Sequence, residues 1–174
     1  MDAHPNRRIL LIALVLLALD QATKLLVAHW LRPLQEWVVI DGFFKIVYWI
    51  NTGAAWSLFP DRNGFLAVVS VLALVGLVVW RRHFYIHSAW GQFSLGLIFG
   101  GILGNLVDRL CWRHVVDMLR FYIVRANGQV LGFPAFNLAD SGICVGVAIL
   151  IIISWNKEPG DANARPASNT ASAP

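Results

Sequence analysis

Four long apolar stretches in this 174-residue chain restrict what it can fold into. They cover residues 9–29, 64–80, 90–111 and 137–155, and each approaches the roughly 17 to 25 residues with which a helix crosses the hydrocarbon core of a bilayer. The second stretch is short, so we expect its helix to start earlier, near Phe59, and to cover about residues 60–80. Only 14% of the residues are charged, against about 25% in soluble domains. The sequence therefore predicts an α-helical membrane protein with four transmembrane helices.

The first apolar stretch has an alternative interpretation as a cleavable signal peptide, because Arg7 and Arg8 precede it. However, Asp20 and Lys24 follow with further apolar residues beyond them, and the stretch has no small-x-small cleavage site. We therefore expect this segment to remain in the mature protein as its first transmembrane helix.

Basic residues near the helix ends indicate how the chain is oriented. Those that fall on one side are Arg7, Arg8, Arg81, Arg82 and Lys157. The loops on the opposite side carry a similar number, but spread over a longer length of chain. By the positive-inside rule, both termini are expected in the cytoplasm. Asp117 and Asp140 then lie at the exocytoplasmic ends of the third and fourth helices.

Both exocytoplasmic loops, at about residues 30–59 and 112–136, carry strand signals. Asp41-Gly42 and Asn127-Gly128 each stand between apolar, β-branched or aromatic runs, which is typical of a two-residue hairpin turn. The runs are rich in aromatic residues, which settle at membrane interfaces. We expect a small exocytoplasmic β-sheet on the membrane surface.

The domain organisation follows from these segments. Residues 1–157 are expected to form a single four-helix membrane domain without an internal repeat. Residues 158–174 are rich in Pro, Ala, Asn, Ser and Thr, so we expect a disordered cytoplasmic tail.

Charge and cysteine content limit the partners. The net charge is +4, but no Lys/Arg cluster exceeds two residues, so attraction to membrane lipids is a sufficient explanation and nucleic-acid binding is not expected. Cys111 and Cys144 have no metal-ligand spacing and form no disulfide framework, so they are interpreted as small apolar side chains. No metal or cofactor is expected.

Two acids are the strongest indication of a functional site. Asp117 lies in a strand-like apolar run with no adjacent basic residue, and Asp140 lies where the last apolar stretch begins. A carboxylate at the edge of a bilayer is costly to keep ionised, so such acids first suggest function. Asn137 and Asp140 also fit a helix N-cap and its acidic N3 residue, so for Asp140 a purely structural role is the alternative to a functional one. Asp117 has no such alternative.

Other polar residues near these acids have structural alternatives as well. Asp20 and Lys24 have the i, i+4 order of a helical ion pair, which is favoured over a catalytic role. Asn105 shares a helix face with Asp108 and Arg109, either as a membrane-interface end cap or as part of a site.

Glycines and turn residues near the same positions have two interpretations too. Gly96, Gly100 and Gly104 recur at four-residue spacing, which is typical of close helix packing. The segment beginning Asn51-Thr-Gly53 is either a turn or a place that binds a substrate backbone.

The motifs Asp20-Gln-Ala-Thr-Lys24, Asn51-Thr-Gly-Ala-Ala55, Gly104-Asn-Leu-Val-Asp-Arg109, Val115-Val-Asp117 and Phe136-Asn-Leu-Ala-Asp-Ser141 occur in this order along the chain. Together they resemble the lipoprotein signal peptidases, the bacterial signal peptidase II family, over nearly the whole chain from the first helix to the fourth. The resemblance implies an aspartic endopeptidase of the bacterial cytoplasmic (inner) membrane. Such enzymes remove the signal peptide of diacylglyceryl-modified prolipoproteins by cutting before the lipidated cysteine.

The resemblance also assigns roles to residues. It implies that Asp117 and Asp140 are the catalytic pair, without a metal or cofactor. The residues that match the family's substrate-binding or supporting positions are Asp20, Lys24, Asn51, Gly53, Asn105, Arg109, Asn137 and Ala139. It further implies lipidated prolipoprotein substrates and inhibition by globomycin-type cyclic peptides, and we expect a monomer. Trp56, His114 and Met118 depart from the family pattern, which leaves the fine shape of the pocket open.

A small transporter or proton-pathway subunit is the alternative from another class, since buried polar residues can also mark a route through a helix bundle. A transporter would place these groups near the midplane and show a repeat, whereas here they cluster toward one side. A purely structural four-helix protein would not need so many isolated polar residues.

Overall fold

The computed structural model describes residues 5–53, 58–84 and 88–155. The elements in chain order are α1 (Pro5–Trp30), β1 (Glu36–Ile40), β2 (Phe44–Asn51), α2 (Asn63–Trp80), the short 3-10 helix η2 (Arg81–His83), α3 (Ala89–Cys111), β3 (Val115–Val124), β4 (Val130–Gly132) and α4 (Leu138–Trp155). The predicted tail at 158–174 and Trp56 lie outside the described residues.

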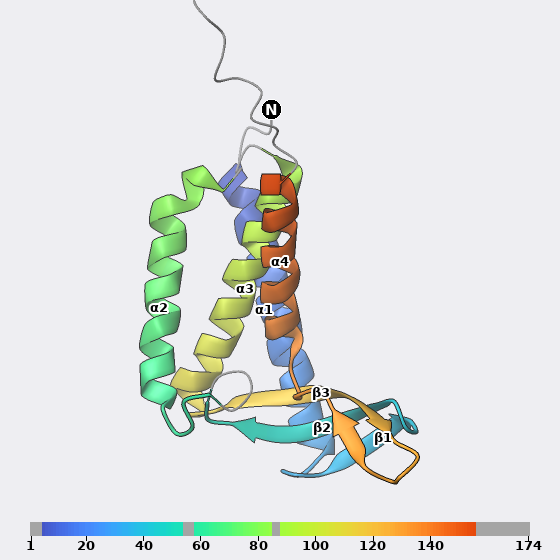
Figure 1. Cartoon of the computed structure of the whole chain (residues 1–174). Helices are drawn as coiled ribbons and strands as arrows, with labels where there is room; N and C mark the ends of the chain where they lie inside the picture. Colours follow the sequence, from blue (N-terminus) through green and yellow to red (C-terminus); the bar gives the residue numbers. More distant parts are fainter. Residues whose placement is uncertain (1–4, 54–57, 85–87, 156–174) are drawn as a thin grey trace, which may run out of the picture.

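Within the described ranges, four helices are long and apolar enough to cross a membrane: Asn6–Trp30, Asn63–Trp80, Ala89–Cys111 and Leu138–Trp155. They stand side by side, and an antiparallel sheet of order β1-β2-β3-β4 lies across one end of the bundle (Figure 1). This architecture confirms the predicted fold class of four membrane helices with a small sheet.

Helix α3 is the centre of the bundle, because the helices α1, α2 and α4 all pack against it. Its glycines allow this close packing. A Cβ atom at Gly96 would lie 2.6 Å from Ile12 Cβ, and one at Gly100 would lie 2.7 Å from the Ala13 carbonyl oxygen. A Cβ atom at Gly101 would collide with the carbonyl oxygen of Ala139. The predicted role of the glycine stripe in helix packing is therefore confirmed, as expected where packing, not hydrophobicity, drives association in lipid.

The start of α2 differs from the sequence prediction. The helix begins at Asn63, not near Phe59. Phe59 and Asp61 have φ angles of 55° and 58°, which a right-handed helix cannot accommodate. The apolar character of the segment around Phe59 therefore belongs to the connection that precedes the helix.

Both predicted hairpins are present in the sheet, but their connections are longer than the predicted two residues. Ile40 pairs with Phe44, and the Arg125 N–H donates to the Gln129 carbonyl oxygen, so three residues lie inside each connection. Gly42 has φ 70° and Gly128 has φ 79°, and a three-residue connection needs only one such left-handed residue.

The pairing of β2 with β3 joins strands from two different loops, and it places Asn51 opposite Val115 and Trp49 opposite Asp117. The sheet thereby brings the end of β2 next to the acid in β3.

Candidate active site

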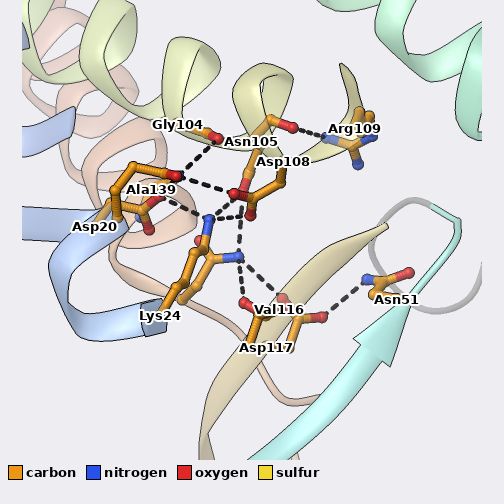
Figure 2. Close-up of polar contacts among 12 residues, drawn as sticks. Asp20, Lys24, Asn51, Gly104, Asn105, Asp108, Arg109, Val116, Asp117 and Ala139 are labelled. Atoms are coloured by element: carbon orange, nitrogen blue, oxygen red, sulfur yellow. Dashed lines mark hydrogen bonds and ion pairs between the residues drawn. The ribbon is translucent and has the colours of Figure 1, made fainter. Parts of the chain in front are cut away.

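The polar residues of the motifs meet where the helix bundle joins the sheet (Figure 2). The last turns of α3 supply Asn105, Asp108 and Arg109, β3 supplies Asp117, and the start of α4 supplies Asp140. Hydrogen bonds and ion pairs connect these groups into one network, so segments more than a hundred residues apart in the chain contribute to a single site.

Asp117 is a buried carboxyl group, with 5% of its surface exposed. Its Oδ2 accepts a hydrogen bond from Asn51 Nδ2 at 2.9 Å, and its Oδ1 accepts one from Asn137 Nδ2 at 3.0 Å. Burial raises the pKa of Asp117 to about 7, and repulsion by the Asp140 carboxylate adds to the rise. The two amide hydrogen bonds and the charge of Lys24 oppose the rise without cancelling it.

Asp140 forms the predicted cap of α4 and also takes part in the polar network. Its backbone N–H donates to Asn137 Oδ1 at 2.9 Å, and the Asn137 backbone N–H donates to Asp140 Oδ2 at 3.3 Å, which is the reciprocal pair of a capping box. The remaining oxygen, Oδ1, accepts a hydrogen bond from Asn105 Nδ2 at 2.7 Å. The two interpretations of Asp140 are therefore compatible, because the cap fixes one oxygen and leaves the other for the network.

Asn137 connects the two acids. Its side chain is fully buried and donates to Asp117, while its backbone N–H donates to Asp140. The same side-chain nitrogen also lies 3.2 Å from Asn105 Oδ1 and 3.3 Å from the Val116 carbonyl oxygen. After burial, repulsion between the two carboxylates is the next cause that raises the pKa of Asp117, so ionising both acids together is costly. Such a pair can act as base and acid in one reaction.

The predicted ion pair of α1 is present, with Lys24 Nζ 2.7 Å from Asp20 Oδ2. The other oxygen of Asp20 accepts a hydrogen bond from the backbone N–H of Ala139 at 2.9 Å. A Cβ atom at Gly104 would lie 2.6 Å from Asp20 Oδ2, so this position of α3 accommodates the acid only as glycine. Asp20 and Lys24 therefore connect α1 to α3 and to the first turn of α4.

Arg109 is connected to the segment after β2. Its Nη2 donates to the Gly53 carbonyl oxygen at 3.2 Å and its Nη1 to the Asn105 carbonyl oxygen at 3.2 Å. The Gly53 backbone N–H donates to Asn51 Oδ1 at 2.9 Å, which fixes the Asn51 amide with its nitrogen toward Asp117. The bond to the Asn105 carbonyl oxygen, one turn earlier in α3, is that of an end cap, and the bond to Gly53 joins α3 to the segment after β2, so Arg109 has contacts of both kinds left open by the sequence.

Sequence reasoning did not place Gln21 or Asn63 in the network. Gln21 Nε2 donates to Asp108 Oδ1 at 2.8 Å and to the Gly104 carbonyl oxygen at 3.2 Å. Asn63 Nδ2 donates to the Arg109 carbonyl oxygen at 2.9 Å. Gln21 could have been found as an amide inside an apolar run, whereas Asn63 carries no local signal because it stands at an ordinary helix start.

Among the described residues, no group of three or more His, Cys, Asp or Glu side chains is arranged to hold a metal ion. The groups gathered at the site are two carboxyl groups with amide and guanidinium donors around them.

Sequence comparisons match this chain to known proteins over most of its length. The family profile "Signal peptidase (SPase) II" matches residues 12–156. A lipoprotein signal peptidase of Aeromonas hydrophila is 40% identical over 156 residues, which are 87% of this chain and 90% of the relative. A lipoprotein signal peptidase of Bacillus subtilis is 36% identical over 142 residues, which are 82% of this chain and 89% of the relative.

Solved structures give a consistent result. A bacterial membrane enzyme solved at 2.3 Å resolution is 31% identical and superposes with a TM-score of 0.73, covering 91% of this chain and 93% of that protein. A second bacterial membrane enzyme, solved at 1.9 Å, is 33% identical with a TM-score of 0.69, covering 86% of this chain and 93% of that one.

Proposed function

Because this chain belongs to the signal peptidase II family, we propose that it is an aspartic endopeptidase that cleaves diacylglyceryl-modified prolipoproteins before the lipidated cysteine. The observation that carries the aspartic assignment is the link through Asn137, which hydrogen-bonds Asp117 with its side chain and Asp140 with its backbone. The transporter alternative would place these groups near the midplane, whereas the pair and its neighbours lie on the last turns of α3, the first turn of α4 and β3.

The proposed reaction uses the shared proton of the pair. The ionised carboxyl takes a proton from a water molecule, and the water oxygen attacks the scissile carbonyl carbon. The protonated carboxyl donates to the carbonyl oxygen and stabilises the tetrahedral intermediate. When the C–N bond breaks, the proton taken from water passes to the leaving amine, which restores the pair. The pKa of about 7 for Asp117 is consistent with a pair that still holds one proton near neutral pH.

The residues around the pair have two proposed roles. Asn51 ends β2 and Gly53 follows it, next to Asp117, and we propose that these residues line the place where the substrate segment binds. Arg109 fixes the part of the chain around Gly53, because its guanidinium group donates to the Gly53 carbonyl oxygen. The residues proposed to support the pair from behind are Asp20, Lys24, Asn105, Asn137 and Ala139.

We propose that the site faces the exocytoplasmic side of a bacterial cytoplasmic membrane, with both termini in the cytoplasm. The N-terminus of α1 lies at the end of the bundle opposite the sheet (Figure 1), and Arg7 and Arg8 belong to its first turns. Exposed tryptophans stand at both ends of the helices, as expected at the two interfaces: Trp30, Trp80, Trp90, Trp112 and Trp155. Residues 1–157 are then the membrane domain and 158–174 a cytoplasmic tail.

The partners follow from this placement. A signal-peptide helix and an acylated cysteine both partition into lipid, so a site at the bilayer edge meets the cleavage site without extracting either. Besides lipidated prolipoproteins and membrane lipids, we propose globomycin-type peptides as inhibitors and a monomer as the active form.

The test of this function is a cleavage assay with purified protein in lipid vesicles. A precursor peptide with a diacylglyceryl-cysteine and the same peptide with a free cysteine are incubated separately, and the products are identified by mass. We expect a product that begins at the lipidated cysteine and little cleavage of the unlipidated peptide. Equal cleavage of both peptides would contradict the substrate assignment, and cleavage of neither would contradict the function.

A further inference from the structure

Lys24 is buried in the membrane-spanning part of α1, with 4% of its surface exposed, and its ammonium group lies among three oxygen atoms of neighbouring side chains. Nζ lies 2.7 Å from Asp20 Oδ2, 2.7 Å from Asp108 Oδ2 and 3.1 Å from Asn105 Oδ1. An ammonium group has three donors and no acceptor. Lys24 donates hydrogen bonds to Asp20 Oδ2 and to Asn105 Oδ1, and it forms an ion pair with Asp108.

The two acids that hold Lys24 are themselves fixed. Asp20 accepts the backbone N–H of Ala139, and Asp108 Oδ1 accepts Gln21 Nε2 at 2.8 Å. These contacts join α1, α3 and α4, so the ammonium group has a fixed position relative to the start of α4. Figure 2 shows Lys24 lying between Asp20, Asp108 and Asn105.

The position of Lys24 determines which way the Asn105 amide points. Only Oδ1 can face an ammonium group, because the amide nitrogen would set donor against donor. With Oδ1 toward Lys24, Nδ2 points at Asp140 Oδ1 and donates to it at 2.7 Å. Asn137 Nδ2 also donates to Asn105 Oδ1, which supports the same orientation. A flipped amide would face Asp140 with an oxygen and Lys24 with an NH2 group, and both contacts would be repulsive.

The two acids of the pair therefore have different surroundings. Both oxygens of Asp140 accept hydrogen bonds, one from the oriented Asn105 amide and one from a backbone N–H of Asn137, which cannot reverse. Asp140 also lies in the first turn of α4, where the helix dipole favours a negative charge. Asp117 lies in a strand, and its two partners are side-chain amides.

From these contacts, and resting on the proposed function, we propose that Lys24 is a positioning residue that orients the Asn105 amide, making Asp140 the carboxylate that activates water and leaving the shared proton on Asp117. Lys24 acts on Asp140 through its contact with Asn105, and its charge also acts on Asp117 through space. The charged groups that interact with Asp140 are Arg109 of α3 and Asp117 of β3, while Asp20 and Asp108 lie at the ammonium group of Lys24. Arg109 interacts with both acids of the pair and more strongly with Asp140, so its charge favours the same assignment.

The test is the pH profile of kcat/KM for the lipidated precursor, in the full-length enzyme. The acidic limb reports the first ionisation of the pair and the alkaline limb the loss of the shared proton. In Lys24→Met the Asn105 oxygen loses its charged donor and keeps only the Asn137 amide, so the orientation of the Asn105 amide is held less firmly. We expect the acidic midpoint to move to higher pH by up to about one unit, the effect of a lost hydrogen bond to a charged group.

Two variants separate orientation from charge. Lys24→Met/Asp108→Asn removes one positive and one negative charge, so the cluster of Asp20, Lys24 and Asp108 keeps its formal charge of −1, and the acidic midpoint is still expected to rise. Lys45→Met is the matched control, because Lys45 is also a buried lysine paired with an acid, Glu36, but lies in the sheet. Its two midpoints are expected to equal those of the wild type.

Several results would overturn the inference. One is an acidic midpoint in a folded Lys24→Met enzyme that equals the wild-type value. Another is a wild-type acidic midpoint in the charge-conserving double variant, because Lys24 would then act only as a charge. Complete loss of cleavage by a folded double variant would give Lys24 a direct part in the reaction. If neither Lys24→Met nor the double variant folds, Asn105→Ala is measured instead. It leaves the ion pairs of Lys24 intact, and its acidic midpoint must lie at a higher pH than that of the wild type. Failure of the wild type to cleave would instead contradict the proposed function.

Discussion

Replacement of Asp117 by asparagine should make the protein more resistant to unfolding at alkaline pH, while it abolishes catalysis. The pKa of Asp117 is about 7 in the folded protein and 3.8 in the unfolded chain, because burial and Asp140 disfavour the second negative charge. The folded state therefore binds a proton more tightly than the unfolded state does. The stability that this proton provides is complete below about pH 4 and is lost as the pH rises through 7.

The size of the effect follows from the two pKa values. Relative to acidic solution, the ionisation of Asp117 costs about 1.7 kcal/mol of unfolding free energy at pH 5 and about 4 kcal/mol at pH 8. Asparagine does not titrate, and its NH2 group replaces one acceptor of the Asn51 and Asn137 hydrogen bonds, at a cost of about 1–3 kcal/mol at either pH. The free-energy difference between Asp117→Asn and wild type should thus change by about 2.5 kcal/mol between pH 5 and pH 8, in favour of the variant.

The assay is equilibrium unfolding in detergent micelles at the two pH values, followed by circular dichroism. Asp41→Asn is the control, because Asp41 is exposed in the turn between β1 and β2. The difference in unfolding free energy between this variant and wild type should be nearly independent of pH. If the difference in unfolding free energy between Asp117→Asn and wild type is also independent of pH, the folded state does not bind a proton on Asp117 more tightly than the unfolded state does, and the reasoning is refuted.

Two further variants test neighbouring contacts. In Asn51→Ala the Asp117 carboxylate loses its donor at 2.9 Å, so the alkaline midpoint of the pH profile should rise by about one unit, and an unchanged or lower midpoint would contradict this. Gly101→Ala places a methyl group against the Ala139 carbonyl oxygen and should lower the free energy of unfolding in detergent by about 1–3 kcal/mol. Gly64→Ala is the control, because no atom lies within 4 Å of its new Cβ, and its free energy of unfolding should stay within about 0.5 kcal/mol of the wild-type value. Equal effects of the two substitutions would refute the close packing of α3 with α4.

The helices and turns of this fold were predictable because their signals are local. Four apolar stretches of sufficient length specify four membrane helices, and Asp41-Gly42 and Asn127-Gly128 specify the turns of two hairpins. The pairing of β2 with β3 has no such signal, since the two strands come from loops separated by two helices. The start of α2 was misplaced because hydrophobicity does not reveal that Phe59 and Asp61 adopt positive φ angles.

The candidate site was predictable in its residues and not in its contacts. Asp117 stood out because a strand-like apolar run gives an acid no structural reason to be there, and the family motifs added the supporting residues. The network that joins Lys24, Asn105 and Asp140 depends on the distance between α1, α3 and α4, which the sequence does not give. Asp140 shows the same limit, because its capping role is local while its bond to Asn105 is not.

Single-turnover cleavage of the lipidated precursor in vesicles is the most direct test of the pair, with wild type, Asp117→Asn, Asp140→Asn and the exposed control Asp41→Asn compared at equal amounts of folded protein. A carboxyl that donates or accepts the transferred proton contributes about 10²–10⁴-fold to the rate. We expect both pair variants to lose at least that much, with the control near the wild-type rate. Wild-type cleavage by either Asp117→Asn or Asp140→Asn would contradict the assignment of this pair as the catalytic acids.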